Sequence, residues 1–237
     1  MLNTRATNNT VALQQPDGVP PAGGLDRQVD PPVPLWAHGK ARRLPAKFVL
    51  YREGAPVDRV FIIRSGMVKL LSYLPNGRAR IVRLHTRDHW VGLEGLLGKG
   101  YDHTAIVANT ALVHAIPIQH LQHLERNNPR ELAGLLYHWH NDLVQADKWI
   151  ANFSTGSIKS RVARLLEFLV TLECSPSANS VELLTVCEMA EILGVTAESV
   201  SRTLAEFKRT DILRKQSIPL RDIYRLDAGK LALEAQY

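Results

Sequence analysis

Residues 185–213 read TVCEMAEILGVTAESVSRTLAEFKRTDIL, and this stretch decides the fold. Thr185, followed three residues later by Glu188, forms a capping box, which predicts the start of a short helix. Gly194 suits the left-handed conformation that ends a helix, and Thr196 suits the N-cap of the next one. The stretch therefore predicts two short helices joined by a tight turn. This is the layout of a helix-turn-helix that places its second helix in the DNA major groove.

The second helix is predicted to turn a polar face outward. On this face an arginine can bond guanine O6 and N7, a glutamate can accept from cytosine N4, and a serine is adaptable. The alternative is an exposed Glu–Arg pair that stabilises the helix by only roughly 0.2–0.5 kcal/mol. The capped helix and turn that precede it favour DNA reading. The apolar residues of this helix fall on the opposite, inward face: Val200, Leu204 and Phe207. The predicted DNA-binding residues are Thr196, Ala197, Glu198, Ser201, Arg202 and Lys208.

The bulk composition agrees with a DNA-binding function. The 237 residues suffice for one large or two ordinary domains, 45% are hydrophobic and 22% are charged, and the formal net charge is +6. A basic balance suits a polyanionic partner. For Lys159 and Arg161, phosphate contact and solvated surface are both open. Without a membrane-length apolar run or a signal-peptide core, we expect a cytoplasmic protein and no membrane partner.

The region from residue 40 to residue 117 has a different pattern of apolar and turn-forming residues. Short apolar runs alternate with turn signals, which predicts an antiparallel sandwich or barrel of short strands. Pro75-Asn76-Gly77 is the strongest hairpin signal, since Asn-Gly tolerates positive φ at both central positions. Residues 1–34 are rich in Asn, Gln, Pro and Gly, and we expect a mostly disordered leader.

A long helix is predicted from residue 129 to residue 153. Its apolar residues are spaced alternately four and three apart, the a/d pattern of a coiled coil. The alternative is a helix packed on its own domain, but one narrow, regular stripe favours a seam between two copies. A dimer also suits a helix-turn-helix protein that reads two half-sites. The predicted seam consists of Leu132, Leu136, Trp139, Leu143, Ala146, Ile150 and Phe153.

The remaining elements complete an α+β fold class. A second helix is predicted at 158–172, a polar, flexible loop at 175–180, a β-hairpin wing at 213–224 turning near Pro219, and a final helix from 227. The predicted domains are the leader (1–34), an antiparallel β-roll (35–128), the long dimerisation helix (129–153) and a winged helix-turn-helix domain (154–237).

This combination resembles the Crp/Fnr family of bacterial transcription regulators over about residues 35–235. The most specific matching segments are EMAEILGVTAESVSRTLAEFKRTDIL, FIIRSGMVKLL and GLEGLL. The resemblance implies a sensor roll of the cyclic-nucleotide-binding type, whose ligand reorients the DNA-binding heads through the dimer helix. It also implies a homodimer on double-stranded DNA, with RNA polymerase as a further partner.

The reading helix resembles the Fnr-type regulators within this family. Their E-x-x-S-R pattern is present as Glu198, Ser201 and Arg202. The cyclic-AMP receptor type carries an arginine immediately before the glutamate, where this chain has Ala197. The resemblance therefore implies a palindrome of TTGAT-N4-ATCAA type, with Arg202 on the guanine.

The effector pocket implied by the resemblance departs from the family pattern. A cyclic-nucleotide site would carry an Arg-Ser pair after GLEGLL, where this chain has His103 and Thr104 beside Asp102. We expect no cyclic AMP, because an unpaired buried phosphate is costly. We also expect no iron–sulfur cluster, because the chain has only two cysteines and none in the leader. The candidate effector-pocket residues are Gly92, Glu94, His103 and Thr104.

Haem remains a candidate cofactor, since some family members bind it. The candidate axial ligands are His85, His89, His114, His138 and His140. A surface or core histidine is the alternative for each of them, and His138 and His140 point to different sides of their helix. We expect Cys187 to be buried and inert rather than a thiol that tunes DNA binding by oxidation.

Two functions fit these patterns. The first is a dimeric, sequence-specific transcription regulator. The second is an effector-sensing module, for haem or another small molecule, that acts through protein partners. The polar reading face and the basic charge favour the first. No nucleophile–base motif, paired-carboxylate signal or metal-ligand pair indicates a catalytic or metal site, so we expect no enzyme.

Overall fold

The computed structural model describes residues 35–122, 124–172, 180–216 and 223–236. The predicted leader, most of the predicted loop at 175–180 and the predicted wing turn near Pro219 lie outside these ranges. None of the helices within the described ranges combines the length and hydrophobicity needed to cross a membrane.

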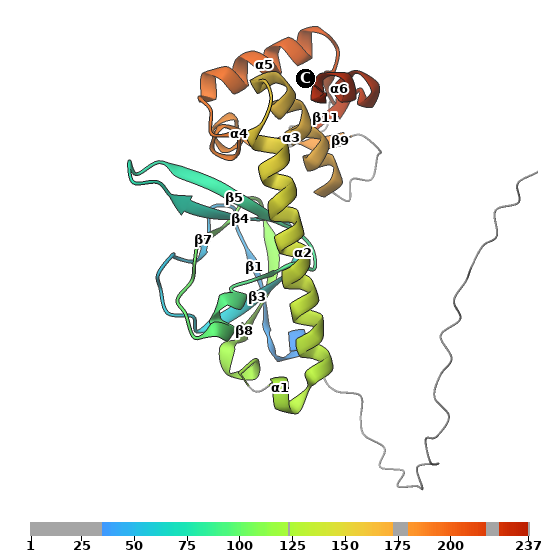
Figure 1. Cartoon of the computed structure of the whole chain (residues 1–237). Helices are drawn as coiled ribbons and strands as arrows, with labels where there is room; N and C mark the ends of the chain where they lie inside the picture. Colours follow the sequence, from blue (N-terminus) through green and yellow to red (C-terminus); the bar gives the residue numbers. More distant parts are fainter. Residues whose placement is uncertain (1–34, 123, 173–179, 217–222, 237) are drawn as a thin grey trace, which may run out of the picture. The chain divides into compact units, whose positions relative to one another are not determined.

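Two four-stranded antiparallel sheets form the N-terminal part, as predicted. The first sheet has the order β1 (Lys40–Leu44), β8 (Ala111–Pro117), β3 (Arg59–Ser65) and β6 (Trp90–Val91). The second has the order β2 (Val49–Tyr51), β7 (Thr104–Val107), β4 (Val68–Tyr73) and β5 (Ala79–His85). Figure 1 shows the strands of both sheets beside the long helix α2 (Pro129–Ser154).

Strand β3 shows why this roll needs a helix at its side. Because successive side chains point to opposite faces of a strand, Phe61 and Ile63 enter the core between the two sheets. Val60 and Ile62 point the other way and pack in a second core that includes Leu135 of α2. These four consecutive residues of β3 are all buried, so this part of the strand is a continuous apolar run rather than an alternating one.

The hairpin at Pro75-Asn76-Gly77 joins β4 and β5, as predicted, but its backbone differs from the expected turn. Gly77 alone takes a positive φ, of 77°. The Gly77 amide donates to the Leu74 carbonyl at 2.8 Å, which places Pro75 and Asn76 at the centre of the turn. Because proline fixes a negative φ, this turn cannot have positive φ at both central positions.

Short helical segments lie before, within and after the strands of the roll, and the last two lead to α2. They are η1 (Leu35–His38), η2 (Leu93–Leu97), η3 (Ile118–His120) and α1 (Leu124–Asn127). Asn128 caps α2, because its side chain accepts from the Glu131 amide at 3.2 Å while Pro129 occupies the first turn. The long predicted helix is therefore present, with a defined start.

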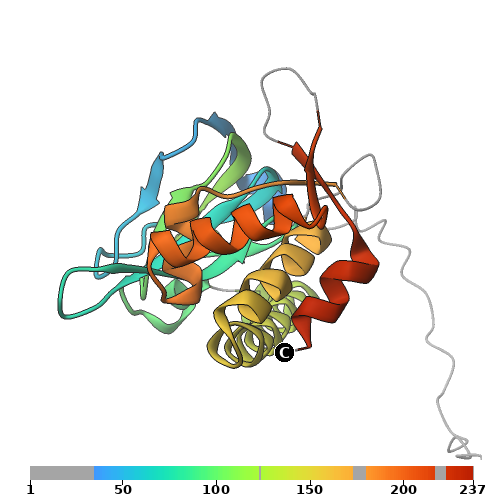
Figure 2. The ribbon, with the colours of Figure 1, turned by 90° about the horizontal axis from the view of Figure 1, so that it is seen from above.

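The C-terminal part contains four helices among its described residues and a three-stranded sheet of order β10-β11-β9. Its helices are α3 (Ile158–Leu172), α4 (Val186–Leu193), α5 (Ala197–Arg209) and α6 (Ala228–Ala235), and its strands are β9 (Ser180–Glu182), β10 (Leu213–Lys215) and β11 (Ile223–Leu226). In Figure 2, α5 faces the viewer, with α4 near its start and β10 and β11 near its end. The α+β fold class and the winged helix-turn-helix order are confirmed.

Candidate nucleic-acid interface

The turn between α4 and α5 is built by the capping residues that the sequence predicts. The Thr185 hydroxyl accepts from the Glu188 amide at 3.2 Å, and the Glu188 carboxylate accepts from the Thr185 amide at 2.9 Å. Gly194 ends α4 with a φ of 65°. The Thr196 hydroxyl then accepts from the Ser199 amide at 3.2 Å and starts α5. These local hydrogen bonds fix where the first turn of α5 is presented.

Helix α5 divides into the two faces that its sequence predicts. Its buried residues are Val200, Thr203, Leu204 and Phe207. Glu198, Ser201 and Arg202 are exposed, and the side chains of Glu198 and Arg202 are 79% and 78% accessible. The Arg202 guanidinium donates to the Glu198 carboxylate at 2.7 Å. An ion pair this exposed is weak, so its partners can exchange it for base edges at little cost.

The other predicted DNA-binding residues have different surroundings. Thr196 is exposed, but its hydroxyl accepts the hydrogen bond that caps α5. Ala197 is half-buried in the first turn of α5. Lys208 is exposed, and its Nζ lies 5.0 Å from the centre of the Tyr224 ring on strand β11. This cation–π contact holds the ammonium beside the wing strand.

The phosphate contacts considered for helix α3 are not supported. The Lys159 ammonium lies 2.8 Å from carboxylate oxygens of both Glu206 and Glu234. The Arg161 guanidinium donates to the carbonyl of Phe153 at 2.7 Å and to the carbonyl of Leu193. Both cations are therefore engaged in holding helix ends together, which their sequence position alone did not reveal.

Comparison with known families agrees with both parts of the fold. A model of the cyclic nucleotide-binding domain matches residues 41–128, and a model of the Crp-like helix-turn-helix domain matches residues 160–229. The chain belongs to the Crp/Fnr family of transcription regulators.

Relatives and solved structures of the Crp/Fnr family cover most of the chain. The transcriptional regulator LdrP of Thermus thermophilus is 28% identical over 201 residues, covering 82% of this chain and 96% of LdrP. The transcriptional activator Anr of Pseudomonas aeruginosa is 26% identical over 198 residues, covering 81% of this chain and 79% of Anr. The structure of FixK2 from Bradyrhizobium japonicum superposes with a TM-score of 0.71 at 20% identity, covering 83% of this chain and 96% of that one. This last likeness is one of fold.

The predicted dimer seam of this Crp/Fnr chain needs one correction. Phe153 is 2% exposed and packs within the chain's own core, so it has no surface to offer a second copy. Leu132, Trp139 and Ala146 are half-buried at the edge of the face that packs on the same chain. The exposed apolar stripe consists of Leu136, Tyr137, Leu143, Val144 and Ile150. Tyr137 and Val144 were missed because the alternating four-three pattern ran along the border between the two faces.

The predicted effector-pocket residues hold the roll's own turns. The Glu94 carboxylate accepts from the Asp102 amide at 3.2 Å, and the buried Thr104 hydroxyl accepts from the Glu53 amide at 3.0 Å. Gly92 has a φ of 88°, which a residue with a Cβ rarely adopts. Burial, together with the nearby Arg83 charge, lowers the pKa of half-buried His103.

Tyr101 occupies the interior next to these residues. Its ring is 3% exposed and stacks on Tyr51 with 3.7 Å between ring centres. Its hydroxyl donates to the Arg59 carbonyl at 2.6 Å, and burial raises the pKa of Tyr101 to about 12. A Cβ on Gly92 would come within 3.0 Å of this ring. Gly92 therefore permits the close approach of Tyr101.

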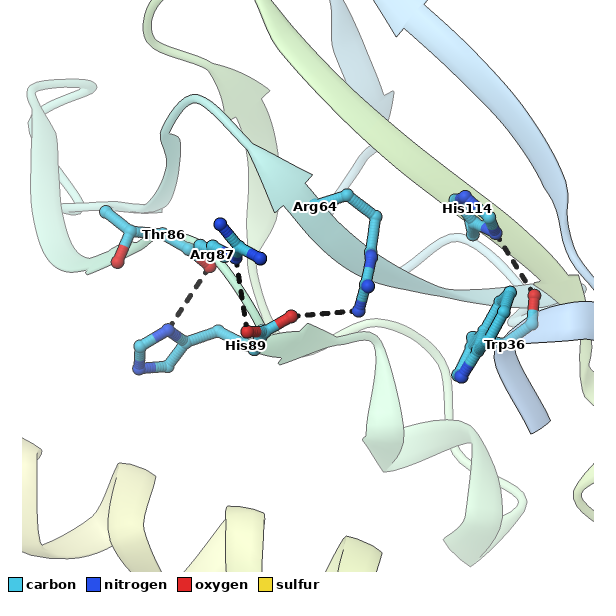
Figure 3. Close-up of polar contacts among 7 residues, drawn as sticks. Trp36, Arg64, Thr86, Arg87, His89 and His114 are labelled. Carbon is cyan, nitrogen blue, oxygen red and sulfur yellow. Dashed lines mark hydrogen bonds and ion pairs between the residues drawn. The ribbon is translucent and has the colours of Figure 1, made fainter. Parts of the chain in front are cut away.

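The histidines and the cysteine have distinct environments. The His114 Nδ1 lies 3.1 Å from the Trp36 carbonyl (Figure 3). Because a carbonyl can only accept, Nδ1 carries the proton and donates it. His138 is half-buried and His140 is exposed on α2. His85 is 3% exposed, and burial, reinforced by the nearby His89 ring, lowers the pKa of His85 to about 3. Cys187 is exposed on α4, so the expectation of a buried cysteine is wrong.

Proposed function

We propose that two copies of this regulator bind a palindrome of TTGAT-N4-ATCAA type. The observation that carries the proposal is the exposed Glu198–Arg202 pair in the first turns of α5, with Ser201 beside it and Ala197 before it. The Arg202 side chain is long and not held by packing, so it can reach the guanine O6 and N7. The Glu198 side chain can likewise reach a cytosine N4. The capping hydrogen bonds of Thr196 and Thr185 hold that turn in place for the groove.

The proposed dimer uses the exposed stripe of α2. Leu136, Leu143 and Ile150 are spaced seven residues apart and are 53%, 56% and 62% exposed. A row of apolar side chains at heptad spacing on one helix is suited to the same row of a second copy. Two reading helices held in this way would face half-sites about one DNA turn apart. RNA polymerase is the partner we propose for the DNA-bound dimer.

The proposal for the roll is that it does not take cyclic AMP. The stacked rings of Tyr51 and Tyr101 fill the interior beside Gly92, and His103 stands where a phosphate-binding arginine would be needed. Calorimetric titration with cyclic AMP tests this point, and saturable binding at micromolar concentration would refute it.

Selection of bound DNA from a random pool tests the DNA site directly. The full chain should enrich sequences with TTGAT and ATCAA separated by four base pairs. A variant Ser201→Ala, Arg202→Ala should lose this enrichment and keep weak, sequence-independent binding. Enrichment of an unrelated motif, or an unchanged motif with the variant, would refute the proposed site.

A further inference from the structure

A cluster of histidine and aspartate side chains lies between the roll and the long helix. His85 ends strand β5, His89 follows in the turn before β6, and Asp142 lies in the middle of α2. One ligand atom from each lies within 4.8 Å of the others. They line a cavity of about 190 Å³ that also touches α3. The sequence pattern indicated no metal site here, because Asp142 is far along the chain from both histidines and only the fold brings it close.

The His85 side chain is an unusual buried group. It is 3% exposed, and its Nδ1 has no hydrogen-bond partner. The Asp142 Oδ1 lies 3.8 Å from this nitrogen, beyond hydrogen-bond distance. A buried polar nitrogen left in this way destabilises the fold, so native proteins rarely keep one. A ligand between His85 and Asp142 would remove this destabilisation.

His89 is oriented as a metal-binding histidine is. Its Nδ1 lies 3.2 Å from the carbonyl of Thr86, the contact drawn in Figure 3. Because a carbonyl can only accept, Nδ1 carries the proton and Nε2 keeps its lone pair. Metal-ligating histidines almost always donate their second ring nitrogen to a carbonyl or carboxylate in this way.

We propose that His85, His89 and Asp142 bind a divalent transition-metal ion of the Zn²⁺ or Fe²⁺ class, and that this ion is the effector of the regulator. Two imidazole nitrogens and one carboxylate oxygen suit these ions, whereas Mg²⁺ and Ca²⁺ prefer oxygen ligands alone. At metal–ligand distances of about 2.0–2.2 Å, tetrahedral ligand atoms lie roughly 3.3–3.6 Å apart. The distance of 3.8 Å between the His85 Nδ1 and the Asp142 Oδ1 is close to that separation. Water would fill the fourth position.

The size of the cavity agrees with an ion, whereas the charge of one lining residue opposes it. Organic ligands usually occupy about 300–1,000 Å³, more than the 190 Å³ found here. Arg83 also lines the cavity and opposes a second cation. Arg83 is half-buried, and its long side chain can turn toward solvent when the ion enters. Arg83→Gln should therefore bind the ion more tightly than the wild type.

The regulatory part of this inference rests on the proposed DNA-binding function. His85 and His89 belong to the roll, whereas Asp142 belongs to the helix that carries the exposed apolar stripe. Coordination would draw Asp142 toward the turn after β5. It would thereby fix α2, and any second copy packed on it, in one position relative to the roll. DNA affinity would then depend on the ion.

Metal binding is tested first, without DNA. The metal-free protein, residues 1–237, is titrated with Co²⁺, whose visible absorbance reports coordination, and Zn²⁺ is then used to displace it. We expect one Co²⁺ per chain, no competition by Mg²⁺, and at least about 100-fold weaker binding for Asp142→Asn and His89→Ala. The matched controls Asp147→Asn on α2 and His114→Ala in the roll should bind as the wild type does.

The folding state of each variant is measured by thermal unfolding in the absence of metal. Asp142→Asn keeps the shape of the side chain and should unfold near the wild-type temperature. Saturating Zn²⁺ should raise the midpoint of the wild type and of Asp147→Asn, but not that of Asp142→Asn. Absence of a stoichiometric Co²⁺ complex, or equal binding by wild type and Asp142→Asn, overturns the metal site.

DNA binding is then measured with and without Zn²⁺ on the selected palindrome. We expect the dissociation constant to change by roughly 5–150-fold in the wild type and not at all in Asp142→Asn. If Co²⁺ binds but the dissociation constant does not change, the effector role is refuted while coordination stands. If neither form binds DNA specifically, the proposed DNA-binding function fails, and the Co²⁺ titration still decides the metal site.

Discussion

Arg202→Ala separates the role of this arginine in reading DNA from its role in the helix. In the free protein its guanidinium pairs with Glu198 at 2.7 Å, and both side chains are more than three-quarters exposed. An exposed pair four residues apart on a helix contributes roughly 0.2–0.5 kcal/mol. The variant should therefore fold with nearly wild-type stability, which thermal unfolding measures.

The loss on DNA should be larger by several-fold. A bidentate arginine–guanine pair contributes about 1–3 kcal/mol of discrimination, or roughly 5–150-fold per half-site. Fluorescence anisotropy with the palindrome and with a version in which each TTGAT is TTAAT gives the four affinities of a double-mutant cycle. Replacing the guanine should weaken DNA binding by the wild type and leave the affinity of Arg202→Ala nearly unchanged.

Arg209→Ala is the matched control for this cycle, because it removes an exposed arginine from the last turn of the same helix. Any weakening in this variant should be equal on both DNA sequences, as expected for a phosphate contact. If the guanine change costs the wild type and Arg202→Ala the same, Arg202 does not read that base and the half-site assignment is refuted.

Three further predictions concern the dimer, the core and a left-handed turn. Leu143→Glu places a charge in the exposed stripe of α2 and should give a monomer by light scattering, while Lys148→Glu should stay dimeric; a dimeric Leu143→Glu would exclude this stripe as the seam. Phe153→Ala removes a ring that is 2% exposed and should lower the free energy of unfolding by about 3–5 kcal/mol in denaturant titrations. Gly66 has a φ of 83°, and a Cβ there would lie 2.4 Å from the backbone at the start of β8, whereas Gly54 is equally left-handed but open. Gly54→Ala should destabilise the fold by about 1–2 kcal/mol and Gly66→Ala by clearly more. Equal unfolding midpoints for the two alanine variants would contradict this.

The features predicted correctly from sequence depend on neighbours along the chain. The capping box of Thr185 and Glu188, the turn at Gly194 and the cap at Thr196 each involve residues within three or four positions of one another. Their chemistry is local, so the sequence contains all of it. The same holds for the two faces of α5, because helical periodicity alone sorts them.

The features that sequence could not supply depend on contacts between distant segments. Phe153 fits the heptad spacing, but the fold places it against Trp149 and Phe168 in edge-to-face contacts, with ring centres 4.9 Å and 5.6 Å away. Arg161 looks like a phosphate ligand at a helix start, yet it caps the carbonyl ends of two other helices. Periodicity identifies an apolar face without identifying what covers it.

Helix α2 connects these observations, because each of its faces meets a different partner. Leu135 and Phe153 bury its inward face in two separate cores, at the roll and at the C-terminal helices. Between them, on the same face, lies the buried carboxylate of Asp142. A leucine at that position would continue the apolar face and avoid the desolvation cost of a buried charge. An aspartate set between two apolar anchors, opposite a histidine nitrogen without a partner, is therefore the residue of α2 through which a bound cation would act on both ends of the helix.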